Sequence, residues 1–138
     1  MQSKKTFKYR HNRQEDMFSW LLERLKMPDA PTTNDIDEVE STLFHKEVIK
    51  NKPFLYKLYL EYYNIFHENI KDIPEGLKIE LGSGGGFLKE IIGDVVTSDV
   101  IDLPGVDKVF FAEKISYPDK SVSAFFLLST LHHIKNPE

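Results

Sequence analysis

The sequence contains no cysteine, which excludes a disulfide framework and any metal site built from thiolates. It has no apolar run long enough to cross a bilayer, and residues 1–13 are basic without the apolar core of a secretory signal. These absences favour a cytoplasmic protein with no membrane anchor. The net charge of -4 argues against a general nucleic-acid surface, although aromatic side chains are interleaved with the basic ones in residues 1–13. We interpret residues 1–13 as a solvated basic tail.

The first part of the chain is dominated by helical periodicity, and we expect a helical segment over residues 14–75. With 138 residues, 41% of them hydrophobic, the chain can bury one core. A first helix is expected over Gln14–Met27 and is ended by Pro28. A second helix is expected to begin at a cap on Thr33 or Asn34. Its apolar face would consist of Ile36, Val39, Leu43 and Val48.

A third helix is expected to begin at Pro53, because proline suits the first turn of a helix. It carries a stripe of aromatic and aliphatic side chains at helical spacing. Such a stripe is typical of a core face, although tyrosines at its rim could also line a substrate pocket. The stripe consists of Phe54, Leu55, Leu58, Tyr59, Tyr62, Ile65 and Phe66.

No metal site is expected. The histidines His11, His45 and His67 stand singly among polar residues, and none has a partner at the spacing of a metal-binding pair.

A glycine cluster at residues 82–86 is the most informative stretch of the chain. Before it, residues 77–81 have the length and apolar character of a buried strand. After it, Leu88, Ile91 and Ile92 stand at helical spacing. Glycine permits positive φ and close approach to the backbone, and the N–H groups of a following helix are unpaired. This strand-to-helix turn therefore predicts a ligand site.

The spacing of the glycines limits the ligand. A dinucleotide fingerprint would need its third glycine at Phe87, and a phosphate-binding P-loop would need lysine and a hydroxyl residue after Gly86. Both patterns fail. What remains is an acid followed by alternating glycines over Glu80–Gly86; a glycine-rich turn without a ligand is the simpler alternative.

Further strands follow the glycine turn. Residues 94–100 are expected to form a second strand that ends at Asp99, whose carboxylate could accept hydrogen bonds from a ribose diol or could simply cap a turn. A third strand is expected over Val106–Phe111, followed by a polar connection. Residues 123–128 form a continuous apolar run of the kind that is buried on both faces of a parallel sheet.

From Leu77 to Pro137 the sequence resembles the class I S-adenosylmethionine-dependent methyltransferases. The segment Glu80–Gly86 matches the family's glycine motif, Ile115–Ser121 its Leu-Pro-Phe-x-Asp-x-Ser pattern, and Leu131–Ile134 its Leu-His-His-Ile run. The resemblance implies that the glycine motif holds the methionine end of the cofactor, the strand-end acid its ribose and the third strand end its adenine. The implied cofactor-binding residues are Glu80, Gly82, Ser83, Gly84, Gly86, Asp99, Val100, Ala112, Glu113 and Leu128.

The resemblance also implies an α/β fold with a Rossmann-like parallel sheet. The family has seven strands in the order 3-2-1-4-5-7-6, and residues 76–138 would supply about four of them, in the order 3-2-1-4. The fourth strand would then be an exposed edge, so we expect a truncated form or fragment, or a homo-oligomer that covers this edge. Two positions depart from the family pattern, because Phe111 and Ser123 stand where many members have aspartate.

The activity implied is methyl transfer from S-adenosylmethionine, with S-adenosylhomocysteine as product, to a small-molecule acceptor that the sequence does not identify. His132 or His133 could act as a general base or could only orient their loop, so the catalytic residues stay open. The alternative is a non-catalytic module that binds the cofactor or a partner. A nicotinamide-binding domain is disfavoured by Phe87. Neither a membrane nor nucleic acid is an expected partner.

Overall fold

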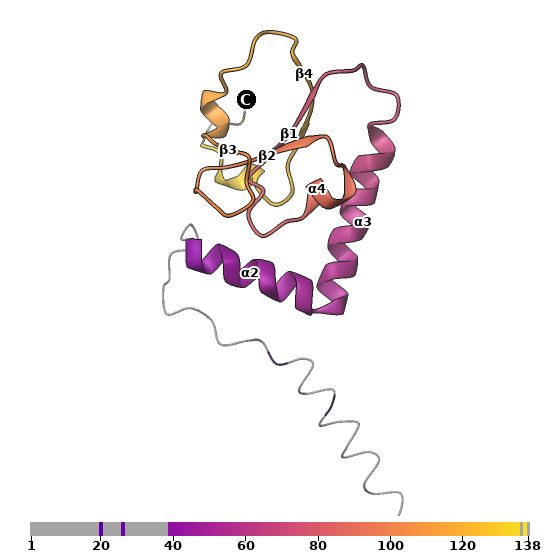
Figure 1. Cartoon of the computed structure of the whole chain (residues 1–138), viewed down its shortest axis with the longest axis vertical. Helices are drawn as coiled ribbons and strands as arrows, with labels where there is room; N and C mark the ends of the chain where they lie inside the picture. Colours follow the sequence, from indigo (N-terminus) through magenta and orange to yellow (C-terminus); the bar gives the residue numbers. More distant parts are fainter. Residues whose placement is uncertain (1–19, 21–25, 27–38, 136, 138) are drawn as a thin grey trace, which may run out of the picture.

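The computed structural model describes Trp20, Lys26, residues 39–135 and Pro137. The basic tail and the cap expected at Thr33 or Asn34 lie outside the described residues, as does the expected helix over 14–27 apart from two positions. The described elements are α2 (Val39–Asn51), α3 (Pro53–Asn69), β1 (Leu77–Leu81), α4 (Leu88–Ile91), β2 (Val95–Asp99), β3 (Lys108–Val109), η1 (Ala112–Lys114), β4 (Val122–Phe126) and η2 (Leu131–His133) (Figure 1).

The four strands form one parallel sheet in the order β3-β2-β1-β4, so the predicted α/β, Rossmann-like fold is confirmed. From β1 the chain steps to β2 and β3 on one side, and then crosses to β4 on the other side of β1. In open parallel sheets, the carboxyl ends of the strands at such a reversal diverge and leave a crevice for a ligand. The glycine cluster directly follows β1 and therefore lies at this crevice.

The centre of the sheet is well anchored. Ile79 of β1 is fully buried, Val95 of β2 is nearly so, and the Ser98 hydroxyl donates a hydrogen bond to the Glu80 carbonyl at 2.7 Å. The Asp107 carboxylate accepts hydrogen bonds from the backbone N–H and the hydroxyl of Thr97, both at 2.9 Å. These bonds tie β2 to the chain that enters β3.

The strand predicted over Val106–Phe111 is shorter, covering only Lys108–Val109. Backbone hydrogen bonds from Asp107 and Phe110 flank it, but the chain then turns into η1. The helix after the glycines is also short and comprises Leu88–Ile91. Both elements are ended by the turns that follow them.

The prediction that residues 123–128 are buried on both faces is wrong. The strand β4 has only β1 beside it in the described sheet, and Phe125 is 44% exposed, whereas Phe126 is 4% exposed. The Phe126 ring contacts Phe66 of α3, with centroids 5.3 Å apart. The helix α3 thus covers one face of β4 and leaves Phe125 open.

The helix α3 begins at Pro53 as predicted, after Lys52 in extended conformation, the conformation that a residue before proline favours. Its aromatic stripe is mainly core, but the buried face is rotated toward Tyr63, which is 1% exposed. Tyr59 and Phe66 pack against this core. The predicted stripe is wrong at Phe54, Tyr62 and Ile65, which are exposed.

The apolar face predicted for α2 is also wrong. The error concerns Val39 and Leu43, which are each 40% exposed, whereas Val48 is buried as predicted and Ile36 lies outside the described residues. The other buried residues of α2 are Ser41, Thr42 and Ile49. Within the part of the chain that the structure describes, no helix combines the length and apolarity needed to cross a membrane.

Candidate ligand-binding site

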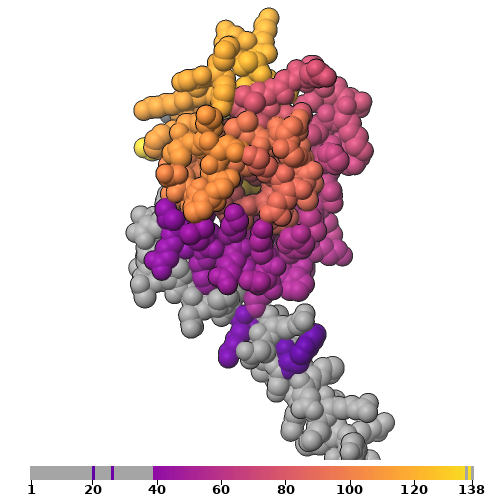
Figure 2. Space-filling model, viewed as in Figure 1, coloured from indigo at the N-terminus to yellow at the C-terminus, as the bar shows by residue number. Residues whose placement is uncertain are grey.

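A cavity of about 980 Å³ opens at the carboxyl ends of β1 and β2. Its walls come from the glycine cluster, the end of β2, the segment around η1, the segment around η2 and the two long helices. Figure 2 shows α2 lying directly against the loops that follow the strands, so this helix forms one side of the site. The topological crevice is therefore a defined pocket with a helical wall.

The glycine cluster adopts the left-handed conformations that the sequence predicts. Gly82 has φ +68° and Gly84 has φ +47°. A Cβ on Gly82 would lie 2.4 Å from Cγ2 of Thr130, whose hydroxyl donates a hydrogen bond to the Gly82 carbonyl at 3.3 Å. Glycine at position 82 is thus required by the backbone conformation and by the packing of the η2 segment.

The other end of the cluster is shaped by the helices. A Cβ on Gly85 would lie 2.9 Å from the backbone nitrogen of Lys46 in α2, and one on Gly86 would lie 2.4 Å from the Tyr63 hydroxyl. That hydroxyl accepts a hydrogen bond from the Phe87 N–H at 3.1 Å. The glycines therefore serve close packing of the protein itself, and the shape of the loop is fixed before any ligand arrives.

Gly82→Ala is expected to lower the free energy of unfolding by about 1–3 kcal/mol, because the new Cβ meets Thr130 and the left-handed backbone becomes strained. Gly93→Ala is the control, since a Cβ there meets nothing within 4 Å and φ is not positive. Urea denaturation of both variants gives the two free energies of unfolding to be compared. Equal midpoints for the two variants would contradict the packing described for Gly82.

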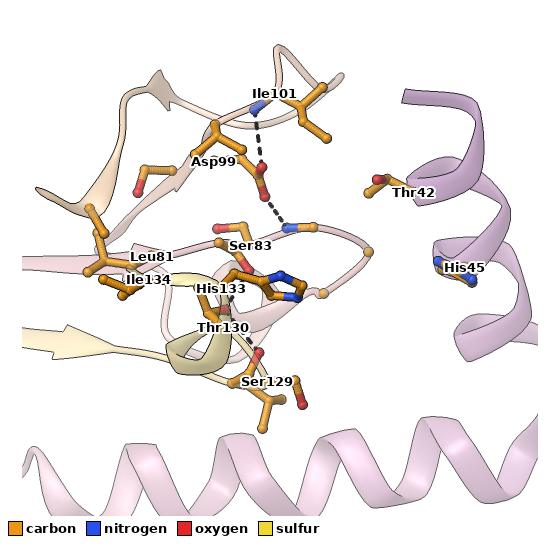
Figure 3. Close-up of a pocket in the computed structure, with 18 of the residues that line it drawn as sticks. Thr42, His45, Leu81, Ser83, Asp99, Ile101, Ser129, Thr130, His133 and Ile134 are labelled. Carbon is orange, nitrogen blue, oxygen red and sulfur yellow. Dashed lines mark hydrogen bonds between the residues drawn. The ribbon is translucent and has the colours of Figure 1, made fainter. Parts of the chain in front are cut away.

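Asp99 connects the end of β2 to the glycine cluster. One carboxylate oxygen accepts a hydrogen bond from the Gly84 N–H at 2.8 Å, and the other accepts one from the Ile101 N–H at 3.2 Å (Figure 3). The second bond is the turn cap that the sequence left open as an alternative. Asp99 is 8% exposed and lines the cavity. Each oxygen retains a further lone pair, so turn capping and ligand binding are compatible.

Glu80 lies behind the glycine cluster and is not part of the cavity wall. It is 3% exposed, and neither its Oε2 nor the Ser83 Oγ has a hydrogen-bond partner among the described residues. Burial raises the pKa of Glu80 to about 7, and the carboxylate of Asp99 acts in the same direction. The Ser83 hydroxyl lies beside the Glu80 carboxyl and lowers its pKa, which partly offsets the effect of burial. Ser83 itself lines the cavity.

The remaining residues predicted to bind the cofactor, including Ala112 and Glu113 at the adenine end, are brought to the same cavity. Val100, Ala112, Glu113 and Leu128 all line it, as does Phe111, which is 56% exposed. Hydrogen bonds from backbone N–H groups lower the pKa of the Glu113 carboxyl. One of these bonds comes from Lys135 at 3.2 Å and joins η1 to the chain after η2.

The two candidate histidines differ in position. His133 lines the cavity, whereas His132 does not. Their ring centroids are 4.0 Å apart, so His132 packs on His133 from outside the pocket. Among the described residues, no group of three or more histidine and acidic side chains is placed to hold a metal ion.

Sequence reasoning missed the helical wall of the site. On α2 the residues that turn inward recur at helical spacing, as polar side chains in the first turns and aliphatic ones at the end. A Lys50–Glu90 ion pair at 2.7 Å holds this helix against α4. Polar and apolar residues share this inward face of α2, and their helical spacing could have identified it. A search for apolar positions alone overlooks such a face. The missed residues of α2 are Thr42, His45, Val48 and Ile49, whereas Tyr59 of α3 lines the cavity as the sequence allowed for the tyrosines of its stripe, and Leu55 lies beside it in the wall.

Comparisons of the chain with protein-family models, with curated proteins and with solved structures found no match. The function is therefore argued from the geometry of this cavity.

Proposed function

We propose that the cavity binds S-adenosylmethionine and that the protein transfers its methyl group to a small-molecule acceptor. The observation that carries this proposal is the arrangement of Asp99, which is fixed to the glycine cluster and to Ile101 at the rim of the cavity. An acid at this strand end is suited to the two hydroxyls of a ribose. The cavity volume of about 980 Å³ lies within the range of small-molecule sites.

The residues present fit the proposed cofactor. Ser83 lines the cavity, and its buried hydroxyl has the Glu80 carboxyl as its polar neighbour. Val100, Phe111 and Leu128 offer apolar surface to a base. Because Asp99 is already held by two backbone N–H groups, little ordering is needed when the ribose binds.

S-adenosylmethionine supplies an activated methyl group on sulfonium, so the protein has mainly to align the reactants. The fixed glycine cluster and Asp99 provide that alignment on one side of the cavity, and the helical wall provides it on the other. We propose a cytoplasmic location on the basis of the cysteine-free sequence.

Titration calorimetry of the full chain with S-adenosylhomocysteine and, separately, with NAD tests the proposal. We expect S-adenosylhomocysteine to bind and NAD not to bind, because the glycine spacing lacks the third glycine of a dinucleotide site. Binding of NAD alone would overturn the proposal. Binding of S-adenosylhomocysteine without methyl transfer to any acceptor would favour the non-catalytic module.

Asp99→Asn is expected to weaken S-adenosylhomocysteine binding about tenfold or more, because an amide replaces one hydrogen-bond acceptor by a donor. Asp102→Asn is the matched control, since this nearby acid is exposed and does not line the cavity. Calorimetry gives both affinities, and thermal denaturation shows whether the variants are folded. Equal weakening by the two substitutions would show a general charge effect and would count against a ribose site at Asp99.

A further inference from the structure

The two sides of the cavity wall differ in chemistry. One side adjoins Asp99 and η1, and the carboxylates of Asp99 and Glu113 there accept hydrogen bonds from backbone N–H groups. The other side, which we name the helical compartment, lies between the helices and η2. Figure 3 shows His45 on α2 and His133 on η2 on either side of the loop that carries Ser83. The compartment is lined by His45, Val48, Ile49, Leu55, Tyr59 and His133.

We propose that the helical compartment binds the methyl acceptor and that this acceptor is a small, largely apolar molecule with a phenol-type hydroxyl. The inference rests on the proposed function, since it assigns the cofactor to the other side of the cavity. Aliphatic side chains and Tyr59 supply an apolar wall for a ring. The close approach of α2 at Gly85 bounds the compartment on this side.

The charges of the compartment favour a hydroxyl over an amine. Among the described residues its lining holds no carboxylate, and the nearby acid Asp99 is assigned to the ribose by the proposed function. An ammonium group would therefore be desolvated without a counter-ion, which is costly. Imidazoles, by contrast, can accept the hydrogen bond of a hydroxyl.

His133 is positioned to receive the proton of that hydroxyl. It belongs to the segment held beside the glycine cluster by the Thr130 hydrogen bond to Gly82. The acceptor oxygen forms a bond to the methyl carbon as the carbon–sulfur bond breaks, and that bond's electron pair stays on sulfur. The hydroxyl proton passes to the imidazole of His133 and from there to solvent.

The test uses the full chain saturated with S-adenosylhomocysteine and two probes, 4-ethylphenol and 2-phenylethylamine, observed by ligand-detected NMR. We expect 4-ethylphenol to bind and 2-phenylethylamine not to bind. His45→Gln and His133→Gln are expected to weaken 4-ethylphenol binding about fivefold each, and His133→Gln to slow methylation of 4-ethylphenol about 100-fold. His67→Gln is the control, because this exposed residue of α3 does not line the cavity.

The outcomes separate the two proposals. If the wild-type chain does not bind S-adenosylhomocysteine, the proposed function fails and the acceptor assignment falls with it. If S-adenosylhomocysteine binds with equal affinity to all variants, but 4-ethylphenol fails to bind, binds all variants alike or is displaced by 2-phenylethylamine, only the acceptor assignment is overturned.

Discussion

Tyr63→Ala is expected to lower the free energy of unfolding by about 3–5 kcal/mol, because it removes a large aromatic side chain from the centre of the core. The Tyr63 side chain is 1% exposed. Its ring packs edge-on against Phe87 with centroids 5.0 Å apart, and it also contacts Tyr59 and Phe66. These contacts join α3 to the start of α4, so the cavity left by alanine would lie beneath the glycine cluster.

The hydroxyl of Tyr63 has a separate effect. Tyr63→Phe keeps the ring but leaves the Phe87 N–H without its partner, which is expected to cost about 1–3 kcal/mol. Tyr62→Phe is the control, because Tyr62 is 40% exposed on the same helix. Urea denaturation of the three variants should rank them as Tyr63→Ala, Tyr63→Phe and Tyr62→Phe in order of decreasing damage. A Tyr63→Phe variant as stable as Tyr62→Phe would contradict the role given to this hydrogen bond.

The parts of the fold that the sequence predicts are those set by local patterns. The strands β1 and β2 follow from short apolar runs bounded by glycine and aspartate, and the glycine turn follows from residues that permit left-handed backbone. The start of α3 follows from Pro53. Glycines 82–86 and Asp99 meet at the cavity because the carboxyl ends of adjacent parallel strands share one edge of the sheet.

The parts that escaped prediction depend on contacts between distant segments. The inward face of α2 is polar in its first turns because it faces the cavity, so Val39 and Leu43 gave the wrong rotation. Similarly, α3 buries Tyr63 instead of Tyr62 because the tyrosine hydroxyl finds the Phe87 N–H and the space beside Gly86. Neither the cavity beside α2 nor the Phe87 N–H beside α3 can be inferred from the periodicity of a single helix.

A second large effect is expected from Glu80, whose buried carboxyl has a pKa raised to about 7 from an ordinary value of 4.5. Well below pH 4.5 both the folded and the unfolded chain hold this proton, so its titration does not change the free energy of unfolding. Between 4.5 and 7 the folded protein keeps a proton that the unfolded chain has lost, so the free energy of unfolding falls as the pH rises. From pH 5 to pH 8 this loss should reach about 2–3 kcal/mol.

Glu80→Gln should abolish this pH-dependent loss, because glutamine stays neutral in both states. The quantity to measure is the difference in free energy of unfolding between Glu80→Gln and the wild type, from urea denaturation at pH 5, 6, 7 and 8. Subtracting the two proteins removes the contribution of the histidines, which both share. Glu61→Gln, at an exposed acid of α3, is the control and should show no such trend.

A constant difference between Glu80→Gln and the wild type across this range would mean that Glu80 is charged throughout. The unpartnered Oε2 would then need a hydrogen-bond donor, and the glycine cluster above it, the element on which the cofactor proposal depends, would have to be arranged differently from the structure described.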